Sequence, residues 1–188
     1  MEQESRDRLI GRATELFSER GFYLVGVEEI IGASDELRIA MHRHFPRKED
    51  LVHAVLEKRS DDILADIAQR LQEIPDPAGK IKGIFDWYGD WFRTPGFAGC
   101  LFERALSEFG VEAEGISDVA IRYRSTLEKQ MADMLRTLVP AKNAVRLATT
   151  YTMLLHGAST AAHAHGDPEA AHHAWQSAKV LLDEASRH

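Results

Sequence analysis

The 188-residue sequence contains a single cysteine, Cys100, and only six prolines and 13 glycines. One thiol excludes an internal disulfide framework and leaves too few sulfur ligands for a zinc ribbon or an iron–sulfur cluster. This cysteine usage predicts a reducing, cytoplasmic location. The charged residues 1–7 lack the apolar segment of a signal peptide. The sequence also has no wholly apolar run of 18 residues, which is the length that would predict a membrane-spanning helix.

The motifs of common catalytic and cofactor sites are missing as well. No glycine-rich phosphate loop, HExxH zinc motif, CxxC pair or GxSxG nucleophile elbow occurs. Histidines gather near the C-terminus, but the spacings 163/165 and 172/173 point to different helix faces, and no acid or thiol completes a ligand set. We therefore expect no cofactor, no metal site and no enzymatic activity.

The hydrophobic pattern predicts an all-α protein of about nine helices. Apolar residues recur at three- and four-residue spacings along most of the chain, and no strand-like alternation of any length occurs. The turns are marked by Gly21, Pro75–Pro77, Pro95–Gly96 and Pro140. The expected helices are a first helix ending at Gly21, then 27–33, 34–44, 47–74, 78–94, 100–109, 116–138 and 141–165, and a last helix capped by Asp167 and Pro168.

Charge is distributed unevenly along this acidic chain. The net charge of −7 argues against a protein that coats nucleic acid. Residues 37–48 nevertheless contain Arg38, Arg43, Arg47, Lys48 and two histidines, and no acid. Such a basic patch can dock on phosphate although the whole chain is acidic. Salt screens the repulsion from acidic residues that lie more than about 8–10 Å away.

The same region has the organisation of a helix-turn-helix. Two short helices, joined by a tight turn, follow an amphipathic first helix, and the second short helix is basic. The major groove of DNA admits one helix, whose basic side chains then meet phosphates. We expect Ile30, Ile31, Ile39 and Phe45 to hold this helix on its support.

Residues 8–56 resemble the DNA-binding domain of the TetR (tetracycline repressor) family of transcriptional regulators. The matching segments are ATELFSERGF, VEEII and HRHFPRKEDL. Downstream, GCLFERALSEFG, LLHGAS and GDPEAAHHAW look like the effector-binding and dimerisation half of one branch of that family. The resemblance implies a helix-turn-helix DNA-binding domain over 1–59 and a helical effector-binding and dimerisation domain over 60–188. It also implies a homodimeric repressor that binds double-stranded operator DNA and is released by a small molecule.

The resemblance also implies which residues contact DNA. Five positions depart from the family pattern: Asp35 replaces the turn glycine, Glu36 the turn valine, Leu37 the capping serine, Ala40 a threonine and His42 a tyrosine. These changes remove groups that bind phosphate and add two acids, so weakened operator binding is expected. The expected DNA-binding residues are Ser34, Arg38, Ile39, Ala40, His42, Arg43, His44 and Lys48.

The second half of the chain offers candidates for an effector pocket and a dimer interface. Trp87 and Trp91, one helical turn apart, suggest the wall of a pocket for a small apolar or aromatic effector. Residues 147–166 contain no Asp, Glu, Lys or Arg, which favours a helix buried by protein in a four-helix bundle between two protomers. The expected pocket residues are Trp87, Trp91, Cys100, Phe102, Tyr151 and His156, and the expected interface residues are Leu155, Ser159, Trp175 and Leu182.

Two alternatives to a ligand-responsive repressor stay open. One is a small-molecule-binding dimer of the same fold that has lost specific DNA binding, for which a variant combining Leu37→Ser with His42→Tyr would restore binding. The other is an enzyme that uses Cys100 or a histidine, although no nucleophile, base and orienting group can be assembled from the spacing.

Overall fold

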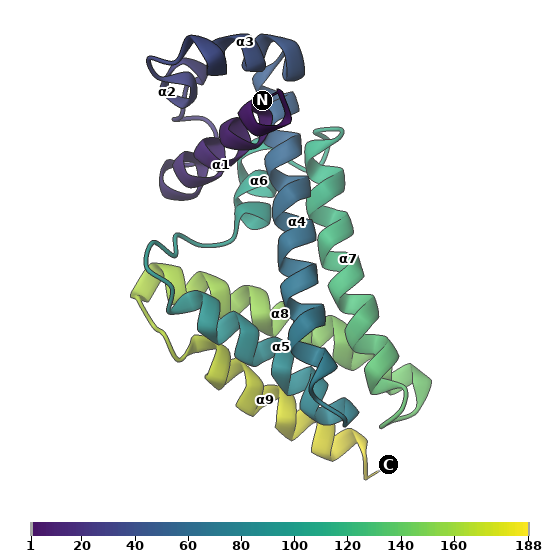
Figure 1. Cartoon of the computed structure of the whole chain (residues 1–188). Helices are drawn as coiled ribbons and strands as arrows, with labels where there is room; N and C mark the ends of the chain where they lie inside the picture. Colours follow the sequence, from purple (N-terminus) through teal and green to yellow (C-terminus); the bar gives the residue numbers. More distant parts are fainter. Residues whose placement is uncertain (1, 188) are drawn as a thin grey trace. The chain divides into compact units, whose positions relative to one another are not determined.

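A computed structural model describes residues 2–187 and shows helices throughout (Figure 1). The described residues form nine α-helices and no strand, which confirms the predicted all-α class. Most boundaries agree with the hydrophobic pattern, but the last helix begins at Ala170, after a turn in which Asp167 accepts a hydrogen bond from the Glu169 amide. The helices are α1 (Glu2–Arg20), α2 (Val27–Ile31), α3 (Asp35–His44), α4 (Lys48–Gln72), α5 (Pro77–Phe92), α6 (Leu101–Phe109), α7 (Ile116–Leu135), α8 (Ala141–His165) and α9 (Ala170–Ala185).

The described residues group into two compact units. The first unit comprises residues 2–61 and 100–121, and the second comprises 62–99 and 122–187. Helices α4 and α7 each contribute to both units. The domain boundary expected at residue 59 would put α6 in the second domain, but α6 packs with the first unit.

The core of the first unit forms around α1, which packs on α2 and α3. The apolar face of α1 is wholly buried at Leu9, Ala13 and Phe17. The ring of Phe22, in the loop after α1, lies 5.0 Å from the Phe17 ring and 5.5 Å from the Phe109 ring of α6. These aromatic contacts anchor the loop that leads into the two short helices.

The second unit is built on α5, α8 and α9, which pack together through small and aromatic side chains. On α8, Ala144 and Ala148 are wholly buried, and so is Ala178 on α9, so the helices approach closely. The ring of Phe85 lies 5.9 Å from that of Tyr151 and 5.5 Å from that of Trp175. Among the described residues, none of the helices has the length and apolar character that crossing a membrane requires.

Candidate nucleic-acid interface and effector region

Helix α3 is the basic helix of the expected helix-turn-helix, and its first residues are arranged differently from the sequence-based expectation. Ser34 caps the helix by accepting a hydrogen bond of 3.2 Å from the Leu37 amide. Asp35 and Glu36 therefore lie in the first helical turn, where acids stabilise a helix, and not in the turn before it. Leu37 is wholly buried, so it serves the core and does not occupy the position of a capping residue.

The outward face of α3 carries four of the expected DNA-binding residues: Arg38, Ile39, His42 and Arg43. Ile39 is 60% exposed, which corrects the expectation that it anchors the helix to its support. Ala40, in contrast, is 5% exposed and belongs to the core side of the helix. The reason is the helical period: with Leu37 and Met41 turned inward, Ala40 shares their face and Ile39 does not.

Carboxylates of the same unit contact the cations of this outward face. Arg38 lies 3.1 Å from Glu28 of α2, and Arg43 lies 3.2 Å from Glu2 of α1. The third acid, Glu36, accepts hydrogen bonds from Ser5 and Arg8 of α1, and the Ser5 hydroxyl is the main cause that lowers the Glu36 pKa. The side chains of Arg38 and Arg43 are 44% and 60% exposed, so DNA can compete with the carboxylates for them.

The remaining expected DNA-binding side chains lie nearer the interior. His44 is partly buried, and its Nε2 lies 3.8 Å from a Glu2 carboxylate oxygen. Lys48, at the start of α4, donates a hydrogen bond of 2.5 Å to the carbonyl of Phe22 and stands 6.0 Å from the centre of the Phe17 ring. Its ammonium group therefore fixes the loop after α1 in this structure.

Helix α6 also fixes this loop, through two residues for which the sequence predicted no such role. The Glu108 carboxylate accepts hydrogen bonds from the amides of Phe22 (3.2 Å) and Tyr23 (2.8 Å). The Arg104 guanidinium donates a 3.2 Å hydrogen bond to the Phe17 carbonyl near the end of α1. Because more than 80 residues of sequence separate these partners, no local pattern indicated the contacts.

The six expected pocket residues do not all belong to one unit. Cys100 and Phe102 belong to the first unit, and Trp87, Trp91, Tyr151 and His156 belong to the second. The Trp87 and Trp91 rings lie 5.7 Å apart and are partly exposed, and Phe97 stands 5.0 Å from Trp91. These three rings form an aromatic cluster, the Trp87–Trp91–Phe97 cluster, which has the composition of a ligand-binding surface.

Three of the expected pocket residues have polar groups whose hydrogen bonds or pKa values are set by their surroundings in the folded chain. The Tyr151 hydroxyl donates a 2.7 Å hydrogen bond to the carbonyl of Ala178 and so ties α8 to α9. Burial and the charge of Arg124, 2.9 Å from the ring, lower the pKa of His156 to about 4, which leaves it neutral at pH 7. Desolvation raises the pKa of Cys100 to about 11, so its thiol is a poor nucleophile.

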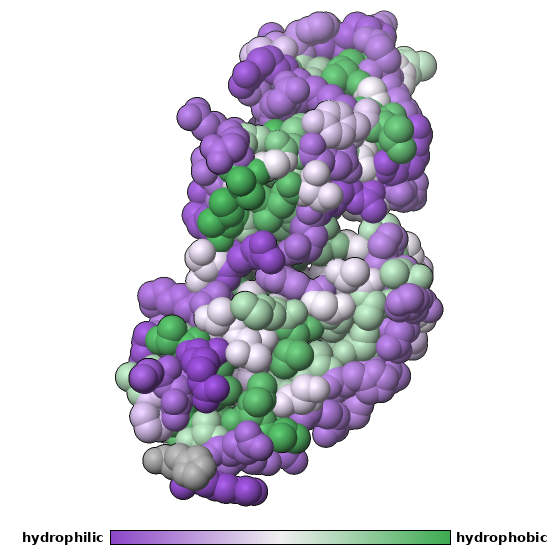
Figure 2. Space-filling view, turned by 180° about the vertical axis from the view of Figure 1, so that it is seen from behind, coloured by the Kyte–Doolittle hydropathy of each residue, from purple (hydrophilic) through white to green (hydrophobic). Residues whose placement is uncertain are grey.

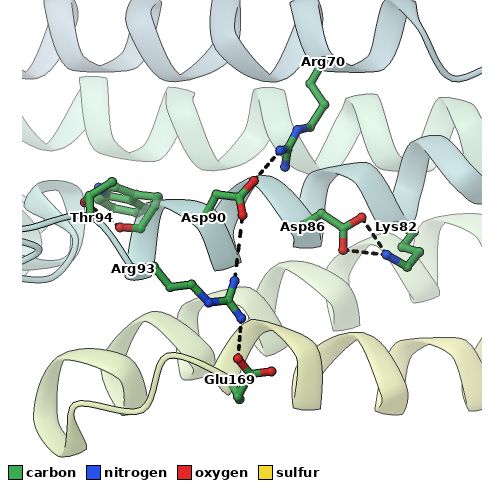
Figure 3. A network of polar contacts seen from close by, with 8 residues as sticks. Arg70, Lys82, Asp86, Asp90, Arg93, Thr94 and Glu169 are labelled. Atoms are coloured by element: carbon green, nitrogen blue, oxygen red, sulfur yellow. Dashed lines mark hydrogen bonds and ion pairs between the residues drawn. The ribbon is translucent and has the colours of Figure 1, made fainter.

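A chain of ion pairs connects three helices of the second unit (Figure 3). Arg70 of α4 pairs with Asp90 of α5, whose other carboxylate oxygen lies 3.8 Å from Arg93. Arg93 in turn pairs with Glu169, which directly precedes α9. Their side chains are between 34% and 60% exposed, so the chain of pairs is a surface feature that orients helices and stabilises them little.

The four expected interface residues lie inside the protomer. Leu155 is wholly buried, and Ser159, Trp175 and Leu182 are less than 10% exposed. These side chains therefore belong mainly to the packing of α5, α8 and α9 within one protomer, and they offer little surface to a second copy. From residue 147 onward neither face of α8 carries Asp, Glu, Lys or Arg, so the periodicity alone did not show which face is turned inward.

The opposite faces of α8 and α9 form an open, largely apolar groove of about 410 Å³. Met153, on α8, is 65% exposed, and Gly157 beside it leaves open space around its Cα. In Figure 2, apolar and near-neutral residues gather over the part of the surface formed by the second unit. The groove is lined by residues that include Met153, Leu154, Gly157, Ala161, His173 and Ser177.

Comparison with known proteins finds similarities in sequence and in fold. Residues 9–55 match the profile of the family described as "Bacterial regulatory proteins, tetR family". The fold is similar to that of a TetR-family transcriptional regulator from Streptomyces coelicolor, with a TM-score of 0.90 and 26% identity over 98% of this chain and 97% of that one.

Two curated relatives are similar over shorter segments. The HTH-type transcriptional activator FasR of Mycolicibacterium smegmatis is 26% identical over 90 residues, which cover 48% of this chain and 41% of FasR. The HTH-type transcriptional repressor DhaR of a Mycobacterium species is 26% identical over 114 residues, which cover 61% of this chain and 54% of DhaR. The chain thus spans about half the length of the curated relatives it matches.

Proposed function

The chain belongs to the TetR family of bacterial regulatory proteins, and on that premise we propose that it regulates transcription by binding operator DNA as a homodimer. The observation that carries the proposal is the arrangement of α3. Ser34 caps this helix, Leu37 and Met41 attach one face to the core, and the opposite face presents Arg38, Ile39, His42 and Arg43. A helix held in this way fits the major groove, where basic side chains meet phosphates and base edges.

The dimer would form through the groove on α8 and α9. A two-fold axis through this surface places the same groove of a second copy against it, and a four-helix bundle results. Exposed Met153 and Val180 and the small residues Gly157 and Ala161 supply the apolar, closely packed contacts that such a bundle needs. Operator binding requires the two recognition helices of such a dimer to stand about 34–36 Å apart, which is one turn of DNA, or a small multiple of that distance.

The regulatory role we propose is that of a repressor released by a small apolar or aromatic effector. The relatives include both a repressor, DhaR, and an activator, FasR, so the sign of regulation is measured by a transcription assay and not by the binding test below. The Trp87–Trp91–Phe97 cluster supports an effector with an apolar or aromatic group. Such an effector lowers operator affinity only as far as it binds the conformation that does not bind DNA more tightly than the one that does.

The test is a selection of DNA sequences from a random library, followed by anisotropy titrations of the selected site at two salt concentrations. We expect a palindromic site and an affinity that falls with salt, with a log–log slope of about −0.9 per phosphate neutralised. An unrelated duplex serves as the control. Equal binding to both duplexes would contradict the proposal.

A dimer that has lost specific DNA binding is the second candidate, because Glu28 and Glu2 hold Arg38 and Arg43. The structure changes the variant that tests it. Leu37 is buried, so a serine there would damage the core, whereas His42 is exposed and accepts tyrosine without repacking. If His42→Tyr creates specific binding that the natural protein lacks, this second candidate is correct.

A further inference from the structure

The contact between Arg38 and Glu28 joins the two helices of the helix-turn-helix on its outward side. The Nη1 atom of Arg38 lies 3.1 Å from one carboxylate oxygen of Glu28 and 3.2 Å from the other. The side chains are 44% and 76% exposed. An exposed ion pair of this kind contributes little to folding stability, so stability does not explain why an acid stands on a surface expected to meet phosphates.

We propose that Arg38 reads a guanine base and that Glu28 is the positioning residue that orients its guanidinium; this inference rests on the proposed function. A guanidinium has five N–H donors, and the two Glu28 contacts both use Nη1, so donors remain for a base edge. Guanine offers two adjacent acceptors, O6 and N7, in the major groove, and arginine binds them as a bidentate pair.

The position of Arg38 along α3 favours this role over that of Arg43. In a helix-turn-helix, residues near the start of the recognition helix reach the base edges. Arg38 is the fourth residue of α3, whereas Arg43 lies in the last turn and pairs with Glu2 of α1. Holding Arg38 in one orientation before binding reduces the entropy that is lost when it meets the base.

Glu28 has a second effect, because its charge repels the DNA backbone. Binding to unrelated DNA depends mainly on phosphate contacts, and an exposed carboxylate beside Arg38 weakens it. Binding to the correct site gains the oriented guanine contact and so compensates for the repulsion. Glu28 therefore increases the ratio of specific to non-specific affinity while decreasing non-specific affinity.

Glu29 supplies a matched control, because it is the next residue on α2 and pairs with Arg20 of α1 instead of Arg38. Glu28→Gln and Glu29→Gln remove the same charge one residue apart. For the full-length natural protein, Arg38→Lys, Glu28→Gln, Glu28→Asp and Glu29→Gln, we would measure the affinity for the selected operator, for its four single-base versions at each position, and for an unrelated duplex. Circular dichroism checks that each variant is folded.

We expect one position per half-site at which the natural protein prefers guanine by about tenfold or more. Arg38→Lys abolishes that preference, Glu28→Gln lowers it at least threefold and binds unrelated DNA more tightly, and Glu28→Asp keeps part of it. Glu29→Gln leaves the preference unchanged. Equal preferences in Glu28→Gln and Glu29→Gln would overturn the positioning role, and a guanine preference that survives Arg38→Lys would overturn the reading role. A natural protein with no sequence preference at all would instead overturn the proposed function, and this inference with it.

Discussion

Both units have apolar cores, but they differ in the contacts that supplement those cores. In the first unit, charged side chains connect separate elements: Glu108 of α6 binds the loop after α1, and Glu28 of α2 binds Arg38 of α3. In the second unit, α8 packs on α9 through alanines and aromatic rings, and its exposed side from 147 to 166 carries no charge. Polar contacts can be exchanged for contacts with phosphate, whereas an apolar surface gains most by being covered with another apolar surface. The difference supports the proposal that the first unit binds nucleic acid and that the second unit binds a second copy of the chain.

The largest expected effect comes from Gly157→Arg, which places a charge in the groove of α8 and α9. Nothing lies within 4 Å of a Cβ atom at this position, so the protomer stays folded. We expect a monomer in analytical ultracentrifugation and a loss of operator affinity of 100-fold or more, since two half-sites no longer bind together. The control is Gly11→Arg on α1, which also has open space. An intact dimer in Gly157→Arg would contradict the proposed interface.

Leu37→Ala tests whether position 37 belongs to the core of the first unit. The side chain is wholly buried, so its truncation should reduce the free energy of unfolding by about 2–5 kcal/mol. Chemical denaturation measures this loss, and Ile39→Ala, on the exposed face of the same helix, is the comparison. A loss no larger than that of Ile39→Ala would mean that Leu37 faces solvent.

Glu108→Gln should weaken the connection between α6 and the loop after α1. The charged acceptor of two amide hydrogen bonds is replaced by a neutral one, which costs about 1–3 kcal/mol of stability in the first unit. Hydrogen exchange at the amides of Phe22 and Tyr23 should become faster, while amides of α8 keep their rates. Unchanged exchange at the two loop amides would show that Glu108 does not hold the loop.

The second unit should lose stability in acid because of His156. Its pKa in the folded protein is about 4, below the ordinary value near 6.5, so the unfolded chain binds the proton more readily between these values. The stabilisation is complete above about pH 6.5 and is lost as the pH falls towards 4. The melting temperature of the natural protein should therefore fall more steeply over this range than that of His156→Gln. Parallel curves would contradict the assignment.

The smallest effect is expected for the surface ion pairs of the second unit. Arg93→Gln removes the contacts with Asp90 and Glu169, both of which are exposed. The free energy of unfolding should fall by less than about 1 kcal/mol, measured by chemical denaturation at low salt. A loss as large as that of Glu108→Gln would mean that the second unit depends on charged contacts as much as the first unit does.

Much of this molecule could be predicted from local patterns, because helix formation depends on neighbouring residues. The nine helices, the tight turn before α3 and the basic character of that helix follow from apolar spacing, glycine positions and charge. The roles of individual residues were harder to predict. Leu37 and Ile39 are both apolar residues of one short helix, and yet one is buried and the other faces solvent.

The sequence by itself therefore determined the helical class, the position of the helix-turn-helix and the resemblance to a family of regulators. The tertiary structure alone decided which face of α8 is covered by α5 and α9 and which is left open, since neither face carries Asp, Glu, Lys or Arg beyond residue 147. It also decided the partners of Arg38, Glu108 and His156. Their contacts join residues between 10 and 86 positions apart, and only the packed fold brings such residues within hydrogen-bonding distance.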